Sequence, residues 1–262
     1  MLKLIRQLAV LSALTSYSFF TGTSSVKAQN TPVCDPSGTV ADLKVTTACK
    51  GTPSRYEIII YEMGLCTADP LASGTFVRTT CTATFTSSGT TTDLAGGASV
   101  SLGSSGSRPA DGSYSHAYIV MGNTFGLSGE YELSAGSLAG TYRSDSNGRA
   151  VLNGALTNFT ETLDNFDHPN TCDPDASDTV GGGTLTAVVA DTTLVTASSC
   201  TGVSRIVASF APSSSIVIDS AATGLKVTFS VTDNGMTVIE DNNGKVVKFT
   251  SGPFSPTFTI LN

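Results

Sequence analysis

Alternating apolar and polar residues near the C-terminal end of the chain predict β-strands. From position 225 to position 232 the alternation is strict, as in a strand with one buried side and one solvent-facing side. Asn234-Gly235 and Asn243-Gly244 follow, and each readily adopts the positive φ angles of a tight hairpin turn. We therefore expect residues 225–250 to form a three-stranded meander.

Further strands are expected upstream. Residues 56–63 are apolar at both parities, which is typical of a central strand that is covered on both faces. A second strand at 82–86 is expected to pair with it, so that residues 67–80 form an excursion from the sheet. Asn147-Gly148 predicts another hairpin.

No segment of useful length has the 3.6-residue apolar period of a helix, so the sequence predicts an all-β fold. The chain is long enough for two antiparallel β-sandwich-like domains with Greek-key or meander topology. The acidic stretch and the glycine triplet within residues 157–182 indicate a boundary. We expect an N-terminal domain over residues 29–165 and a C-terminal domain over residues 166–262.

Residues 1–28 have the pattern of a cleaved export signal. Lys3 and Arg6 precede an apolar stretch at 8–20, and Val26-Lys27-Ala28 provides small or compact residues at the cleavage site. The apolar stretch is shorter than the roughly 20 residues of a membrane-spanning helix. The sequence thus predicts an exported protein of the periplasm, cell surface or extracellular space, with no integral membrane segment after cleavage.

Six cysteines lie in the exported part of the chain, and no CxxC or close Cys/His set indicates zinc. Six cysteines allow 15 pairings. Pairing between neighbours along the chain keeps each disulfide within one expected domain. The favoured pairs are Cys34 with Cys49, Cys66 with Cys81, and Cys172 with Cys200.

The chain is acidic, with a net charge of −7. The signal contains three basic residues and no acidic one, so its removal changes the net charge to −10. Phosphate contacts need clustered Lys and Arg, which this chain lacks, so a nucleic-acid partner is not expected. Few charged residues and abundant Ser, Thr and Gly are typical of sheet surfaces in secreted proteins.

The stretches at 90–94 and 108–121 resemble a pattern of exported bacterial modules. In that pattern an Asp-Leu strand precedes a Pro-Ala-Gly-Thr-Tyr entry into a long strand; here Asp111 is inserted and Ser113 replaces Thr. Over residues 56–134 the chain is similar to transthyretin-like or carboxypeptidase-regulatory-like β-sandwiches. The resemblance implies a sandwich fold and a surface role, and it carries over no catalytic residue.

Aromatic and acidic clusters suggest two kinds of ligand. Tyr114, Tyr118 and Tyr131 could stack on sugar rings, or they could fill the core of the sandwich. Asp173, Asp175 and Asp178 have a spacing loosely suited to calcium, which is the one cofactor the sequence suggests. The alternative for the aspartates is a solvated acidic linker.

Catalysis is not expected, because the chain has only two histidines, His116 and His168. Ser115 precedes His116, and neighbouring residues of a strand point to opposite faces, so we expect no easy hydrogen bond between them. A glycoside hydrolase is the minor alternative, because such enzymes use a pair of carboxylates and several lie on or near predicted strands. The candidates are Glu57, Glu62, Glu130, Glu132 and Asp219.

Taken alone, the sequence favours a non-enzymatic surface or extracellular protein with a structural or adhesive role. Its expected partners are surface polymers or other copies of the chain, which exposed sheet edges could recruit by strand addition. A carbohydrate- or ligand-binding module is the main alternative.

Overall fold

The computed structural model describes eighteen β-strands and no helix. In the described part of the chain, no helix is long and apolar enough to cross a membrane. The expected signal at 1–28 lies outside that part. The described residues are 31–35, 48–95, 107–134, 137–166, 171–241 and 243–262.

Eight strands form the largest sheet, which is antiparallel throughout. Seven lie in the order β10, β6, β2, β5, β13, β12, β11, and β3 pairs with β2. The bounds are β2 Arg55–Cys66, β3 Cys81–Asp93, β5 His116–Gly122, β6 Thr124–Ser128, β10 Phe159–Thr162, β11 Asp175–Val180, β12 Gly183–Ala190 and β13 Arg205–Pro212.

The other ten strands form four smaller antiparallel sheets. Two sheets have three strands, ordered β1–β16–β17 and β7–β8–β9, and two are pairs, β14–β4 and β15–β18. Their bounds are β1 Ala48–Gly51, β4 Gly112–Tyr114, β7 Glu130–Leu133, β8 Gly140–Ser144, β9 Ala150–Leu152, β14 Ile216–Ile218, β15 Gly224–Ser230, β16 Met236–Glu240, β17 Val246–Ser251 and β18 Ser255–Leu261.

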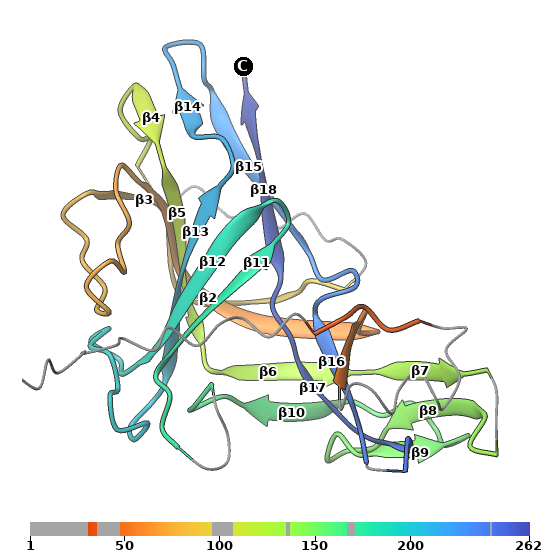
Figure 1. Cartoon of the computed structure of the whole chain (residues 1–262). Helices are drawn as coiled ribbons and strands as arrows, with labels where there is room; N and C mark the ends of the chain where they lie inside the picture. The colour runs from red at the N-terminus through yellow and green to blue at the C-terminus, as the bar shows by residue number, and fades with distance from the viewer. Residues whose placement is uncertain (1–30, 36–47, 96–106, 135–136, 167–170, 242) are drawn as a thin grey trace, which may run out of the picture.

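The sheets pack face to face in an upright part and a part that runs across it (Figure 1). β5 and β13 belong to the upright part, and the chain turns at Asn123 into β6, which runs along the other part. Apolar residues of the large sheet and of β15, β16 and β17 share one core, which includes Tyr56, Phe229 and Phe249. The expected all-β, sandwich-like architecture is therefore confirmed.

Strand β2 changes the face that its side chains bury. Ile58 and Ile60 lie in the main core, and after a register irregularity between Ile60 and Glu62 the core residue is Met63. Cys66 then belongs to a second cluster, on the opposite face of the sheet. A β-bulge shifts the alternation by one residue, and this explains why Met63 shares a face with Ile58 and Ile60 despite its odd number.

All three favoured cysteine pairs are present as disulfides, and none of the described cysteines is free. Cys66 and Cys81 also face each other at the ends of β2 and β3, so they close the excursion at 67–80 as expected. The hairpin at Asn147-Gly148 is likewise confirmed, since β8 pairs with β9 and Gly148 has φ 72°.

The expected meander at 225–250 is wrong in its first pairing. β16 and β17 form the expected hairpin, but β15 pairs with β18, and β16 pairs on its other side with β1. Between β15 and β16 the chain turns with Asp233, not Gly235, in the left-handed region. The alternation at 225–232 identified the strand correctly, but a period of two residues does not specify which neighbour the strand takes.

The division into two domains at 165/166 is also corrected, because strands from both sides share one sheet. β5 pairs with β13 over six consecutive residue pairs. β14 pairs with β4, and β1 pairs with β16. Turn residues and composition signal where the chain bends, whereas these pairings join segments that are far apart in the sequence, so local signals could not reveal them.

Candidate functional site

The three candidate sugar-stacking tyrosines are buried and lie in different clusters. Tyr114, Tyr118 and Tyr131 are only 4 to 7% exposed. Each hydroxyl donates a hydrogen bond within the protein: to Ala110 O, Glu62 Oε1 and Asp35 O, respectively. The expectation of an aromatic binding patch is therefore wrong; these rings fill the core, which was the alternative.

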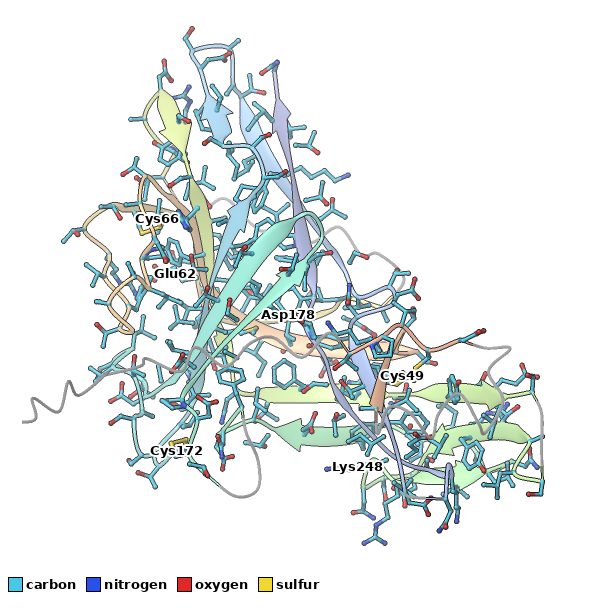
Figure 2. All side chains as sticks on the ribbon, in the orientation of Figure 1. Cys49, Glu62, Cys66, Cys172, Asp178 and Lys248 are labelled. Carbon is cyan, nitrogen blue, oxygen red and sulfur yellow. A yellow bond between two sulfur atoms is a disulfide. The ribbon has the colours of Figure 1, made fainter. Side chains whose placement is uncertain are left out.

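The candidate calcium ligands do not converge. Asp175 and Asp178 lie on opposite faces of β11, on which Figure 2 labels Asp178. Asp178 Oδ2 accepts a hydrogen bond from Lys50 Nζ at 2.7 Å. Asp173 uses its backbone to bond Asn165 and Phe166. Throughout the described ranges, no group of three or more His, Cys, Asp or Glu is arranged to hold a metal ion. The proposed calcium set is therefore corrected: one of its carboxylates is the partner of a lysine.

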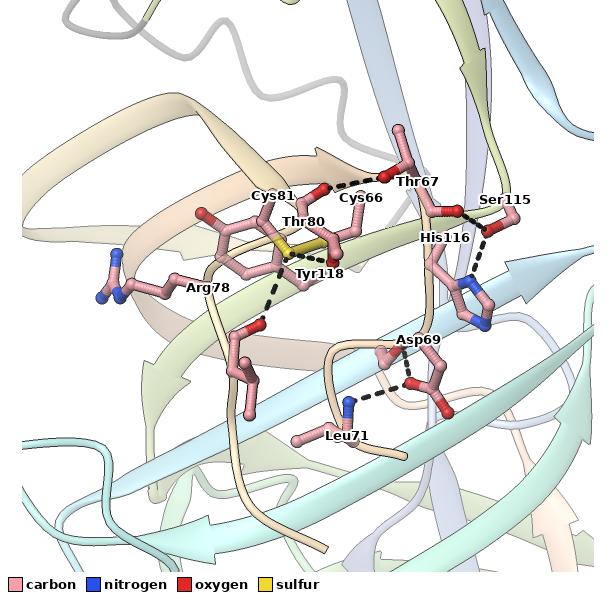
Figure 3. The surroundings of a disulfide bond; sticks show 12 residues. Cys66, Thr67, Asp69, Leu71, Arg78, Thr80, Cys81, Ser115, His116 and Tyr118 are labelled. Atoms are coloured by element: carbon pink, nitrogen blue, oxygen red, sulfur yellow. Dashed lines mark hydrogen bonds between the residues drawn. A yellow bond between two sulfur atoms is a disulfide. The ribbon is translucent and has the colours of Figure 1, made fainter. Parts of the chain in front are cut away.

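Ser115 and His116 do form a hydrogen bond, contrary to expectation. Ser115 Oγ lies 2.8 Å from His116 Nδ1 and 3.0 Å from Thr67 O (Figure 3). The carbonyl can only accept, so the single hydroxyl proton of Ser115 goes to Thr67 and the proton between serine and histidine comes from Nδ1. In this state Nδ1 cannot act as a base toward Ser115, and the pair fastens β5 to the loop at 67–80. His168 lies outside the described residues.

Glu62 is the most enclosed of the strand carboxylates considered for hydrolysis. Its Oε1 accepts hydrogen bonds from Tyr118 Oη, 2.5 Å away, and from Arg78 Nη1. Burial, followed by the hydrogen bond to Glu62, raises the pKa of Tyr118. The Phe76 ring packs on Tyr118 with ring centroids 5.2 Å apart. This network attaches the disulfide-closed loop to the outer face of the large sheet.

A glycine allows this packing. A Cβ on Gly64 would lie 2.3 Å from Thr82 O and 2.5 Å from Tyr118 Cε1, so only the absence of a side chain lets the tyrosine ring lie on β2. Leu71 from the loop is buried in the same cluster. The loop at 67–80 is thus anchored at several points.

The remaining hydrolase candidates do not share a cleft. Glu57 and Glu130 each form an ion pair, with Arg55 and Arg143 respectively. An apolar cavity of about 30 Å³ lies between the large sheet and the β15–β18 pair, and an open groove of about 430 Å³ lies next to it. Neither is lined by a carboxylate. The paired carboxylates that glycoside hydrolysis requires are absent from both.

The groove is more open than the neighbouring cavity and is a candidate binding surface. It runs between β18 and the segment that links β13 to β14, and it shares Phe210 and Phe258 with the internal cavity. None of its lining residues is charged. Val217 on its wall is 58% exposed. Such an uncharged surface suits an extended, uncharged partner.

Sequence reasoning did not single out this groove, although a signal for it exists. Residues 206–218 and 249–262 contain no charged side chain, in a chain whose net charge is −7. The first run supplies one wall of the groove and the second supplies β18. Two uncharged runs become informative only when they are known to lie together, which required the tertiary structure.

No protein-family model, curated protein or solved structure matches the chain.

Proposed function

We propose that this protein is exported and acts by binding or self-association, as a structural or adhesive component of the cell surface or extracellular space. Three disulfides indicate an oxidising compartment such as the periplasm or the extracellular space. The export signal expected at 1–28 gives the route to that compartment.

The observation that carries the proposal is the uncharged groove beside β18. An open strand edge with apolar side chains next to it can accept an additional strand, which gains main-chain hydrogen bonds and buries apolar surface. Phe258 and Ile260 of β18 line this groove and are only half-buried. In contrast, Glu62, His116 and the three tyrosines considered for chemistry or sugar binding make contacts that hold the fold together.

A direct test follows the full chain in a host that exports it. After export, we expect the chain to lack its first 28 residues, to contain no free thiols, and to be found with the envelope or in the medium. We also expect the purified exported protein to associate with itself, or to bind cells or envelope polymers. Retention in the cytoplasm with reduced cysteines, or a protein that neither associates nor binds, would contradict the proposal.

A further inference from the structure

One edge of β18 is paired and the other is open beyond its first residues. β18 pairs with β15 over seven consecutive residue pairs without a bulge. Among the described strands, none pairs with its other edge. At its start β18 lies against the β11–β12 turn, because a Cβ on Gly181 would lie 2.5 Å from Ser255 Cβ. The rest of β18 extends past the β11–β12 turn into the end of the molecule formed by β4, β14 and β15 (Figure 1).

Pro256 indicates which backbone groups face the open side. Pro256 is opposite Phe229 and has no N–H, so it suits a position that makes no hydrogen bond toward β15. Backbone groups alternate along a strand, so Phe258 and Ile260 also direct their N–H and C=O groups away from β15. The open edge therefore presents the backbone N–H and C=O groups of Phe258 and Ile260, which are two hydrogen-bond donors and two acceptors.

The groove lies along this same edge. None of its lining residues belongs to β15, while Thr257, Phe258 and Ile260 of β18 form one side of it. The groove and the strand are uncharged, so an occupant does not have to desolvate a charge on this surface. The lining of this uncharged groove mixes Phe, Ile, Val and Pro with Ser and Thr. Its occupant should itself be an extended, uncharged segment in which apolar and hydroxyl residues alternate, and β18 has this pattern.

Several other exposed edges carry features that oppose strand addition, and the uncharged edge strands β4, β9 and β14 are only three residues long. β11 contains Asp175 and Asp178, and β15 contains Lys226. β3 is irregular in register at two places. On β10, Glu161 accepts a hydrogen bond from Ser251 N. Charges and bulges are the usual protection of edge strands, and β18 has neither after Pro256.

We propose that two copies of this chain associate through antiparallel pairing of β18 with β18, around a two-fold axis at Thr259. In this register Phe258 faces Ile260 of the second copy, and Ile260 faces Phe258 of the second copy. Phe258 and Ile260 are the residues whose backbone groups point outward, so in this register each N–H donates to the C=O of the residue opposite it in the second copy. Paired residues share a face of the sheet, so both apolar pairs lie on the groove side. The interface is the same patch on both copies, as a two-fold axis requires.

This inference rests on the proposed function and specifies its partner. The pairing involves about five residues per copy, which is less than the roughly 800 Å² per partner of a stable standard interface. We therefore expect a reversible, concentration-dependent dimer, which becomes favourable where copies are crowded at a surface.

Thr259→Glu is the most selective test. In its own chain residue 259 is opposite Lys226, so the new carboxylate is compatible with folding. In the dimer two carboxylates meet on the two-fold axis, and dimerisation should weaken by about tenfold or more. Thr91→Glu, at an exposed position of β3, makes the same change in net charge away from the interface and should dimerise like the wild type.

Thr259→Cys gives a positive signal. In the proposed dimer the two copies of residue 259 lie opposite each other on the axis, with their Cβ atoms within disulfide range. Exported Thr259→Cys should therefore form a covalent dimer on a non-reducing gel. Thr91→Cys should not. Sedimentation of the exported full chain over a range of concentrations provides the equilibrium measurement. The inference is supported if the wild type and Thr91→Glu dimerise equally well and Thr259→Glu dimerises much more weakly. Of the two cysteine variants, only Thr259→Cys should form the covalent dimer.

Two results would overturn it. If Thr259→Glu associates as strongly as the wild type, another surface is responsible, and the proposed function stands without this interface. If the wild type stays monomeric at every concentration, the β18 interface is wrong. In that case the proposed function is tested separately. It stands if the monomer binds cells or envelope polymers, and it fails if the monomer does not.

Discussion

Lys50 Nζ lies 2.7 Å from Asp178 Oδ2, and this ion pair joins β1 to β11 across 128 positions of the chain. The side chains of Lys50 and Asp178 are 12% and 26% exposed, so the pair is largely removed from solvent. It links an edge strand of the large sheet to the β1–β16–β17 sheet. An aspartate that the sequence suggested for calcium is thus part of the contact between two sheets.

Replacing Asp178 should destabilise the fold. Asp178→Asn leaves the largely buried Lys50 ammonium without its carboxylate, and we expect a loss of about 1–3 kcal/mol in the free energy of unfolding. Denaturant titration measures it. Asp175→Asn, on the exposed face of the same strand, is the control and should change stability by less than about 0.5 kcal/mol. Equal effects of the two variants would contradict this role for the ion pair.

The hydroxyl of Tyr118 should stabilise the disulfide-closed loop. Tyr118→Phe keeps the ring against Phe76 but removes one of the two donors to Glu62, which costs about 1–3 kcal/mol because a buried carboxylate oxygen loses one of its hydrogen bonds. Limited proteolysis should cleave within residues 67–80 faster than in the wild type. Ser73→Ala, at the exposed part of the loop, should leave the cleavage rate unchanged. A cleavage rate equal to that of the wild type would show that the network does not anchor the loop.

The disulfide of the same loop should contribute independently of that network. Replacing Cys66 and Cys81 together by alanine opens a loop of 15 residues. The chain-entropy model predicts a loss of roughly 3 kcal/mol. The midpoint of chemical unfolding under oxidising conditions checks this value. Because β2 and β3 pair up to the disulfide itself, we expect the sheet to keep its circular dichroism signal below the transition, and loss of that signal would refute the expectation.

Glu240 should make stability depend on pH. It is 8% exposed and its Oε2 has no hydrogen-bond partner among the described residues. Burial, followed by the neighbouring Asp241, raises the pKa of Glu240 to about 7. Between its unfolded pKa, near 4.5, and this value the folded chain retains a proton that the unfolded chain has released. This contribution to stability is therefore complete below about pH 4.5 and is lost as the pH rises to about 7.

Glu240→Gln removes the titration. At pH 8 the variant should be more stable than the wild type by about 1–2 kcal/mol, a range that allows for partial screening by solvent, and at pH 4 the two should be similar. Unfolding free energies at the two pH values provide the measurement. Glu132→Gln, an exposed strand position, should show no such difference. A stability gap between Glu240→Gln and wild type that is the same at pH 4 and pH 8 would argue against titration of Glu240.

Local patterns predicted the fold class, many of the strands and the three disulfides. Alternation revealed strands such as β15 because a sheet face imposes a period of two residues. Asn147-Gly148 and Asn243-Gly244 revealed hairpins because the glycine of each pair adopts the positive φ angle that the turn needs. The cysteine pairs followed from closeness along the chain. These features depend on residues near each other in sequence.

Partners distant in sequence were decided by the tertiary structure. The same alternation at 225–232 is compatible with pairing to β16 or to β18, and packing against the large sheet selected β18. Tyr114, Tyr118 and Tyr131 have ring faces suited to sugars, yet burial commits them to the core. The sequence by itself determined where many of the strands form and favoured the cysteine pairs that the structure contains. Only the folded chain decided which strands are neighbours and which edge stays open, because apolar burial depends on contacts between segments that are far apart in the sequence.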